Sequence, residues 1–280
     1  MLLYRTIEGL SLCDQPGEPL DSLAGVEWDE IFVGAISSRD LVGRRSTDRK
    51  RSAVDVASGT GLLPPIGSQE VWAAGVTYLR SRTARMEESA DAGASDFYDR
   101  VFNAKSPELF FKATPHRVVG HGQPMKLRID SHWNVPEPEL TLAFTNRGDL
   151  LGYTIGNDLS SRDIEGENPL YLPQAKVFEK CAALGPGLLL SDSYPGPETR
   201  IHVKIRRSGA EIWSGETRIA NMKQTFDNLR EHLFRCDTFP TGCYLMTGTG
   251  VVPDNDFTLR PNDEVSITID NVGTLTNVIV

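Results

Sequence analysis

The part of the chain beyond residue 105 consists mainly of short apolar stretches that alternate with polar residues and end at turn signals. The clearest of these stretches are 109–112, 138–144, 151–155, 200–206 and 265–269. Such alternation is typical of strands with one buried face, and many short strands favour a rolled or barrel-like sheet. In this part of the chain, helices are predicted only after Asp158 and near 223–233. The predicted fold class is therefore α+β and rich in strands.

A proline-containing break divides the chain into two predicted domains. The break is Leu62-Leu63-Pro64-Pro65-Ile66-Gly67, which suits a linker. Residues 1–66 are predicted to form a small N-terminal domain, and residues 67–280 a larger one. The larger domain begins with a predicted buried strand at 70–76.

The segment 79–104 is polar and is predicted to be helical. Ala-Gly-Ala at 92–94 interrupts it, so we expect two short helices. A pair of this kind can act as a mobile lid over a site. A packed helical hairpin on the surface explains the same pattern, and both explanations stay open.

The charge of the chain argues against nucleic acid as a partner. The formal net charge is -9, and an acidic protein repels a phosphate backbone. One basic stretch, from Arg44 to Arg51, lacks interleaved aromatic residues and is expected to be solvated surface. The sequence contains neither Gly-x-Gly-x-x-Gly nor a phosphate-binding loop, so no nucleotide or other organic cofactor is expected.

Several features predict a cytoplasmic protein without membrane contact. Arg5 interrupts the N-terminus too early for a secretory signal. No apolar run approaches the roughly 20 residues that span a bilayer. The four cysteines form no Cys-x-x-Cys pair, which suits reduced thiols better than a disulfide framework or a zinc site.

Two glutamates lie two positions apart in Pro136-Glu137-Pro138-Glu139-Leu140-Thr141-Leu142. On a strand, Glu137 and Glu139 project from the same face. A hard cation such as Mg²⁺ or Ca²⁺, which prefers oxygen ligands, would remove the repulsion between them. An ordinary pair of surface glutamates is the alternative explanation.

Two further charged residues stand next to apolar segments. Asp158 is placed where a strand gives way to a helix, so it either caps that helix or supplies a third carboxylate ligand. Lys176 lies in a partly apolar stretch. It either extends its ammonium to the surface or, beside a metal ion, moves protons.

Six motifs in this order resemble the fumarylacetoacetate hydrolase superfamily, and the similarity runs from about Val71 to the C-terminus. They are E-P-E-L at 137–140, N-D-L-S-S-R-D at 157–163, A-K-V-F at 175–178, L-G-P at 184–186, T-G-T-G at 247–250 and N-V-G-T-L at 271–275. The resemblance implies a mixed β-roll in the larger, catalytic domain and a separate small N-terminal domain. It also implies a homo-oligomer, either a dimer or a dimer-based tetramer.

The same resemblance implies roles for individual residues. Mg²⁺, with Ca²⁺ or Mn²⁺ as alternatives, would be held by Glu137, Glu139 and Asp158. Lys176 would be the catalytic lysine. The substrate would lie beside three side chains, Arg162, Glu165 and Thr249. Many members of the superfamily have glutamine where Glu165 stands.

Two positions after the first strand of the larger domain bear on the type of reaction. Hydrolytic members resemble one another there in a pattern Gly-x-Asn-Tyr-x-x-His-x-x-Glu, whose His and Glu activate water. This chain has Ser81 at the histidine position and Ala84 at the glutamate position. Neither residue type is a suitable general base. A different water-activating pair from the helical segment is the alternative.

Three other segments resemble the 2-keto-3-deoxy-arabinonate dehydratases of this superfamily, namely 107–115, 119–122 and 167–174. Those enzymes remove water from a 2-keto-3-deoxy aldonate and yield 2,5-dioxopentanoate. The resemblance implies a Mg²⁺-dependent dehydratase of a small 2-oxo acid. Lys176 would then remove a C3 proton and Glu165 would protonate the leaving C4 hydroxyl. Arg162 or Arg82 would meet the substrate carboxylate.

Two other functions stay open at this point. One is a hydrolase or decarboxylase of an acylpyruvate or oxaloacetate that uses the same metal ion. The other is a catalytically silent binding protein that keeps the fold. A complete set of three carboxylates and a lysine argues against the silent protein.

Overall fold

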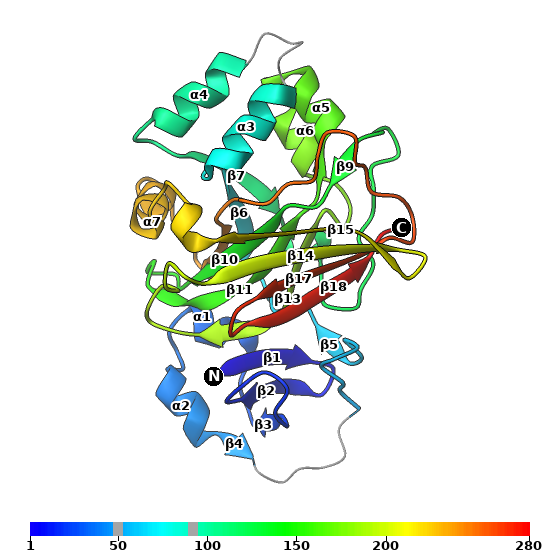
Figure 1. Ribbon diagram of the computed structural model, residues 1–280. Helices are drawn as coiled ribbons and strands as arrows, with labels where there is room; N and C mark the ends of the chain where they lie inside the picture. The colour runs from blue at the N-terminus through cyan, green and yellow to red at the C-terminus, as the bar shows by residue number, and fades with distance from the viewer. Residues whose placement is uncertain (47–52, 89–94) are drawn as a thin grey trace.

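The computed structural model describes residues 1–46, 53–88 and 95–280, and a 12-stranded sheet runs through most of the molecule (Figure 1). Its strands are β1 (Leu2–Thr6), β2 (Gly9–Cys13), β3 (Asp21–Leu23), β4 (Arg45–Ser46), β5 (Leu62–Leu63), β6 (Glu70–Gly75), β7 (Glu108–Ala113), β8 (Val118–Val119), β10 (Pro138–Phe144), β11 (Leu150–Asp158), β13 (Ala182–Leu190) and β16 (Cys243–Met246). They are arranged in the order β4-β3-β2-β1-β13-β11-β10-β16-β6-β7, with β5 beside β1 and β8 beside β13.

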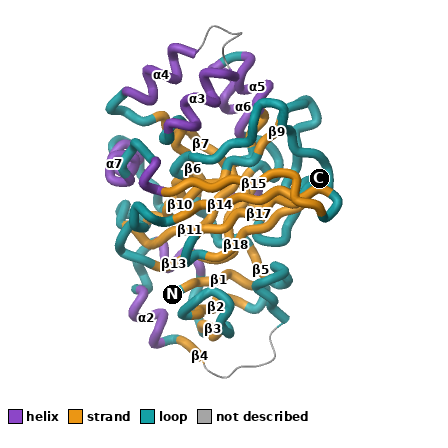
Figure 2. Tube along the Cα trace, viewed as in Figure 1, coloured by secondary structure: helices purple, strands orange, loops and turns teal. Residues whose placement is uncertain are grey.

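A second sheet packs across the first (Figure 2). It contains β14 (Arg200–Arg207), β15 (Ala210–Arg218), β17 (Glu264–Ile269) and β18 (Gly273–Val278), in the order β15-β14-β17-β18. Leu142 and Leu245 of the large sheet share one apolar core with Val203 and Ile267 of the small sheet. A short ladder joins β9 (Asn134–Val135) to β12 (Ser160–Ser161). The predicted β-rich α+β class with a mixed, rolled sheet is confirmed.

Helices are short and lie mainly at the ends of the molecule. They are α1 (Trp28–Phe32), α2 (Ser38–Gly43), α3 (Leu79–Glu88), α4 (Ser95–Asn103), α5 (Arg162–Glu167), α6 (Leu172–Lys176) and α7 (Phe226–Phe234), with 3₁₀ turns at Pro115–Arg117, Pro169–Tyr171 and Ile219–Asn221. Figure 1 places α3 to α6 at the end opposite β2, β3 and β4. Across the described part of the chain, no helix is long and apolar enough to cross a membrane.

The helical segment predicted at 79–104 consists of two helices, α3 and α4, as expected. The Ala-Gly-Ala interruption at 92–94 lies outside the described residues, as do Arg49 to Arg51 of the basic stretch. Whether α3 and α4 form a lid stays a prediction.

The large sheet continues across the predicted domain boundary at residue 66. Strand β1 pairs antiparallel with β13, with Leu2 opposite Leu189. Phe32 from the N-terminal part packs in the same apolar cluster as Met246. The Tyr244 hydroxyl donates a hydrogen bond to the Pro65 carbonyl. The division into two domains stays a prediction, but the two parts share a sheet and a core.

Candidate metal and catalytic site

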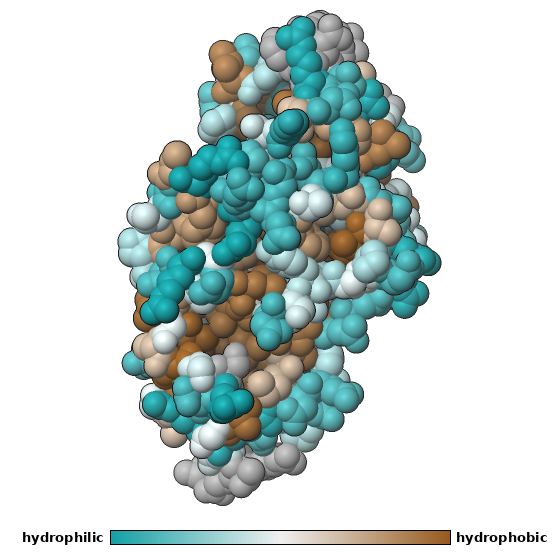
Figure 3. All heavy atoms as spheres, turned by 90° about the vertical axis from the view of Figure 1, so that its left-hand side faces the viewer, coloured by the Kyte–Doolittle hydropathy of each residue, from teal (hydrophilic) through white to brown (hydrophobic). Residues whose placement is uncertain are grey.

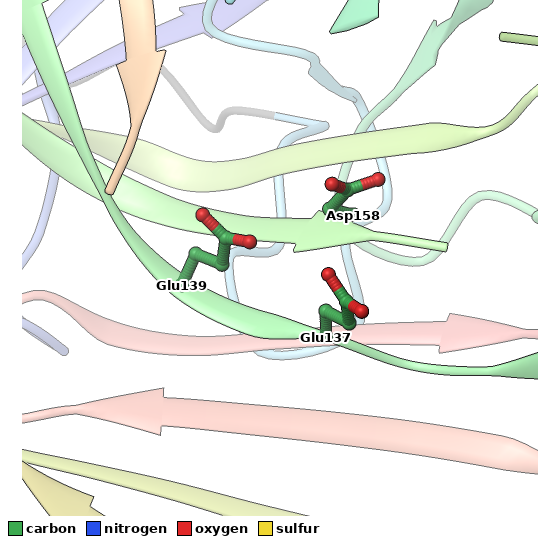
Figure 4. Close-up of side chains that lie close together, drawn as sticks. All are labelled: Glu137, Glu139 and Asp158. Carbon is green, nitrogen blue, oxygen red and sulfur yellow. The ribbon is translucent and has the colours of Figure 1, made fainter. Parts of the chain in front are cut away.

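The pairing of β10 with β11 brings three carboxylates together. Glu137 precedes β10, whose first residue is Pro138, and Asp158 is the last residue of β11. The Asp158 amide donates to the Glu137 carbonyl at 3.0 Å. Glu137, Glu139 and Asp158 are all buried, and each offers an oxygen within 4.8 Å of the others. Figure 4 shows the three carboxylates around a common space. A surface glutamate pair is therefore excluded.

The three carboxylates differ in how their charge is compensated. Burial, followed by the neighbouring Asp158 and Glu137, raises the pKa of Glu139 well above its ordinary value. Burial alone would also raise the pKa of Asp158, but the Lys112 and Lys176 ammoniums outweigh it and hold that pKa below its ordinary value. Removing the repulsion that acts on Glu139 is what a bound cation would do.

Gly248 supplies a backbone donor to this group. Its amide donates to Glu139 Oε2 at 2.5 Å. The residue has a φ of +89°, and a side chain there would overlap the Thr77 hydroxyl. The glycine of the T-G-T-G motif is thus required both for the turn and for the close approach of the backbone to the carboxylate.

Lys176 lies between two of the carboxylates. Its Nζ is 2.7 Å from Glu137 Oε2, 3.0 Å from Asp158 Oδ2 and 2.6 Å from Ser160 Oγ. The side chain is fully buried and the Phe110 ring centroid is 5.6 Å from the ammonium. Helix α6, which ends at Lys176, directs this side chain inward, so extension to the surface is excluded.

Arg162 and Glu165 on α5 add two further buried charges beside the triad. Arg162 Nη2 is 3.0 Å from Glu137 Oε1, and Arg162 Nε is 3.9 Å from Glu165 Oε2. Glu165 Oε1 is 3.8 Å from Lys176 Nζ. Ser161 is the N-cap of α5, so Asp158 does not have the capping role that the sequence left open.

A small cavity of about 10 Å³ reaches the triad and Lys176. Thr249 and Phe110 contribute to its wall, and so does Ser81. A volume of this size holds about one water or one ion. The Ser81 hydroxyl donates to the Tyr78 carbonyl at 2.8 Å and accepts from the Tyr78 amide at 3.2 Å. This hydroxyl therefore stabilises the first turn of α3. The side chain of Ala84 lies outside the described residues.

Arg82 is held within the α3–α4 pair. Its Nη2 is 2.5 Å from Asp99 Oδ1, and its guanidinium carbon is 5.5 Å from the centroid of the Phe102 ring. The cavity wall includes the preceding residue, Ser81, but not Arg82. A contact between Arg82 and a substrate carboxylate stays a prediction.

Sequence reasoning missed Lys112, which lies on β7 and, like Lys176, is a fully buried lysine. Its Nζ is 2.5 Å from Asp158 Oδ1. The signal was available, because Lys112 follows Leu109, Phe110 and Phe111 in an apolar strand, as Lys176 lies in an apolar stretch. Ser160, whose hydroxyl accepts a hydrogen bond from Lys176, was also missed, because a serine in a motif carries no signal of its own.

The donor set fits a hard divalent cation. Three buried carboxylates supply oxygen ligands, which suit Mg²⁺ and Ca²⁺. The raised pKa of Glu139 marks the cost of burying this carboxylate and of crowding it against two others without a cation. The triad can therefore bind a metal ion.

Comparisons with known proteins found a matching family model and similar sequences. A family model described as fumarylacetoacetate (FAA) hydrolase C-terminal matches residues 71–280. The chain is 45% identical over 257 residues to a probable 2-keto-3-deoxyxylonate dehydratase of Haloferax volcanii, covering 91% of this chain and 84% of the relative. It is 43% identical over 216 residues to a 2-dehydro-3-deoxy-D-arabinonate dehydratase of Saccharolobus solfataricus, covering 76% and 72%.

One solved structure is similar along the whole chain. It is a 2-keto-3-deoxy-D-arabinonate dehydratase complexed with magnesium and 2,5-dioxopentanoate. The TM-score is 0.86 and the identity 33%, and the match covers 100% of this chain and 98% of the other.

Proposed function

This chain belongs to the fumarylacetoacetate hydrolase family, and from that premise we propose that it is a Mg²⁺-dependent dehydratase of a 2-keto-3-deoxy sugar acid. A 2-keto-3-deoxy pentonate such as the arabinonate is the proposed substrate, and 2,5-dioxopentanoate the product. The observation that carries the proposal is the buried triad with Lys176 inserted between Glu137 and Asp158. The similarity of the chain to two dehydratases, at 43% and 45% sequence identity, supports the same reaction.

Glu137, Glu139 and Asp158 are the proposed ligands of the metal ion. When bound, Mg²⁺ supplies Lewis-acid chemistry that polarises a 2-oxo group and stabilises negative charge developing as C3 loses a proton. The buried charged groups at the site are the three triad carboxylates, a fourth carboxylate on Glu165, and three cationic side chains, Lys112, Lys176 and Arg162. With Lys176 protonated, these charges and a divalent ion sum to one positive charge. With Lys176 as the free amine that removes the C3 proton, the sum is zero before the substrate carboxylate arrives.

Lys176 is the proposed base. As a free amine, its Nζ accepts the C3 proton, and Ser160 Oγ at 2.6 Å keeps the side chain in position. Glu165 is the proposed acid that protonates the leaving C4 hydroxyl. Its Oε1 is 3.8 Å from Lys176 Nζ. Loss of water leaves a C3–C4 double bond. Two further proton shifts, from C5 and its hydroxyl to C3 and C4, give the aldehyde of 2,5-dioxopentanoate.

Substrate contacts are proposed for Arg162, Thr249 and Arg82. Arg162 is buried beside Glu137, and a guanidinium suits a carboxylate. Thr249 lies in the cavity wall. Arg82 would have to exchange Asp99 for the substrate. The cavity of about 10 Å³ is too small for a sugar acid, so we propose that α3 moves when substrate enters.

A substrate panel tests the proposed function. The purified protein is incubated with 2-keto-3-deoxy pentonates, acylpyruvates and oxaloacetate, each with Mg²⁺, Mn²⁺ or Ca²⁺ and each with a chelator. We expect 2,5-dioxopentanoate from a pentonate, at a rate that the chelator abolishes. Faster pyruvate formation from an acylpyruvate or oxaloacetate would replace the dehydratase by the hydrolase or decarboxylase. Failure of all substrates together with failure to bind Mg²⁺ would favour a silent binding protein.

We also propose a homo-oligomer in the cytoplasm. Apolar residues gather on the face shown in Figure 3, and exposed apolar areas mark association surfaces. A hollow is lined by Met1, Leu150, Leu151 and Leu190, with Ser191 and Asp192 at its side. The four cysteines are all free, which supports a reducing compartment. Light scattering would measure the oligomer, and a monomer at micromolar concentration would contradict it.

A further inference from the structure

Lys112 is a buried ammonium that the reaction described above does not use. It lies on β7, is fully buried, and its Nζ is 5.6 Å from the centroid of the Phe178 ring. Burying an ammonium is costly unless each of its protons has an acceptor. A fully buried lysine of this kind therefore needs a structural or functional reason.

Three oxygens surround the ammonium: two backbone carbonyls that accept hydrogen bonds and one carboxylate oxygen in an ion pair. Lys112 Nζ is 2.5 Å from Asp158 Oδ1 and donates to the carbonyls of Leu159, at 3.0 Å, and Lys176, at 2.5 Å. These acceptors belong to the end of β11 and the end of α6. One side chain thus joins β7 to the two backbone segments that carry a proposed metal ligand and the proposed base.

The contacts of Asp158 are divided between two lysines. Oδ1 faces Lys112 and Oδ2 faces Lys176 at 3.0 Å. The carboxylate can therefore not rotate without losing one ion pair. The backbone carbonyl of Lys176 is held by the same ammonium that holds Oδ1. Lys112 consequently fixes the plane of the Asp158 carboxylate and the backbone from which the Lys176 side chain extends.

We propose that Lys112 is a positioning residue, which aligns Lys176 and Asp158 for transfer of the C3 proton; this rests on the proposed dehydratase function. Lys112 itself touches no reacting atom in this role. Its loss should impair the proton transfer more than substrate binding. A displacement of about 1 Å at a reacting group can lower a rate by about 100-fold.

Lys112→Met tests the proposal, with Lys126→Met as the matched control. Methionine keeps most of the length of the side chain but removes the charge and the three donors. Lys126 is a half-exposed lysine paired with Glu179 at 2.5 Å, outside the buried cluster. At saturating Mg²⁺ we expect kcat of Lys112→Met to fall about 100-fold, KM to change less than about threefold, and Lys126→Met to match the wild type.

Two measurements separate positioning from a loss of folded protein. Thermal unfolding and a calorimetric Mg²⁺ titration report the fraction of folded, metal-binding sites. The deuterium isotope effect on kcat with substrate deuterated at C3 should rise in Lys112→Met, because misaligned proton transfer becomes rate-limiting. A smaller folded fraction would lower kcat without changing that isotope effect. If Lys112→Met does not fold, Lys112→Gln, which can still donate to the carbonyls, carries the same test.

The outcomes distinguish this proposal from the proposed function. A wild type that does not dehydrate any pentonate overturns the function. With an active wild type, three results overturn the role of Lys112: normal kcat in a folded variant, activity that excess Mg²⁺ fully restores, or an unchanged isotope effect. A raised isotope effect with intact Mg²⁺ binding supports it.

Discussion

Glu139 carries a cost in the metal-free protein that a cation would remove. Burial and two neighbouring carboxylates raise its pKa well above the ordinary value. We predict that Glu139→Gln lowers Mg²⁺ affinity by about 100-fold or more, since even loss of a supporting contact can cost about 10–100-fold. The wild type should gain about 2.7 kcal/mol of stability when Mg²⁺ is 100 times its Kd, and the variant should lose that gain.

Calorimetry and thermal unfolding with and without Mg²⁺ measure both effects. Glu179→Gln is the matched control, because Glu179 is exposed and pairs with Lys126. Without Mg²⁺, Glu139→Gln should be at least as stable as the wild type, since it removes a crowded carboxylate. Unchanged Mg²⁺ affinity would remove Glu139 from the ligand set.

The raised pKa of Glu139 also predicts a pH dependence. Between the ordinary value of 4.5 and the raised pKa, the folded metal-free protein holds a proton that the unfolded chain has released. Its stability therefore falls as pH rises through this window. Glu139→Gln should lack this decrease, so the variant's advantage should grow with pH. Denaturant unfolding from pH 5 to pH 8, with chelator present, measures the two slopes, and parallel slopes would contradict the assignment.

Lys176 is expected to act in the chemical step. Lys176→Met should lower kcat by about 10²–10⁴-fold, the usual contribution of a general base. KM should change little. Mg²⁺ affinity should hold or rise, because an ammonium 2.7 Å from Glu137 is removed. Steady-state kinetics and Mg²⁺ titration measure these effects. A normal kcat with only a raised KM would make Lys176 a binding residue.

At the residue scale, the sequence predicted most of the buried cluster but not its connections. Because Glu137 and Glu139 are two positions apart, the sequence predicted that both side chains lie on one side of a strand. Both are buried, which is consistent with that prediction. The approach of Asp158 depends on β10 pairing with β11, and that register is a long-range property. The Lys112 contacts join three segments distant in sequence, so periodicity alone could not predict them.

At the scale of elements, the first turn of α3 limits the reactions available. Ser81 stands where the resemblance implies a histidine in hydrolytic members, and its hydroxyl is occupied by the Tyr78 backbone. Hydrolysis of a C–C bond needs an activated water, whereas dehydration releases one. We predict that kcat/KM for a 2-keto-3-deoxy pentonate exceeds that for acetylpyruvate by about two decades, about 2.7 kcal/mol.

Paired assays at saturating Mg²⁺ measure this selectivity, with 2,5-dioxopentanoate and pyruvate as products. Faster pyruvate release would mean that another residue of the 80–88 segment activates water.

The predicted strands at 109–112, 138–144, 200–206 and 265–269 are all present as parts of β7, β10, β14 and β17. Their order in the two sheets could not be predicted, because alternation determines which face is buried but not the neighbouring strand.

At the scale of the whole molecule, the N-terminal 66 residues are part of the architecture that supports the site. Strand β1 covers the edge of β13, and β13 pairs with β11, which ends at Asp158. Leu3 and Phe32 are fully buried in the cluster that contains Leu188 and Met246. The sequence predicted a linker at 62–67 from its prolines, but composition could not reveal that the sheet continues across it.

We therefore predict that the fragment 67–280 does not form a stable, soluble domain. Without residues 1–66, the fragment would expose the edge of β13 and the apolar faces that Leu3 and Phe32 cover in the full chain. Each buried side chain of this size contributes about 1.5–3 kcal/mol, so the loss of several is comparable with the stability of about 5–15 kcal/mol that a typical protein has. An unpaired strand edge also promotes aggregation.

Expression of the fragment and of the full chain, followed by gel filtration, circular dichroism and Mg²⁺ titration, measures the difference. Supplying residues 1–66 as a separate chain should restore part of the soluble, Mg²⁺-binding protein. A fragment that unfolds cooperatively and binds Mg²⁺ like the full chain would establish that the N-terminal part folds as an independent domain.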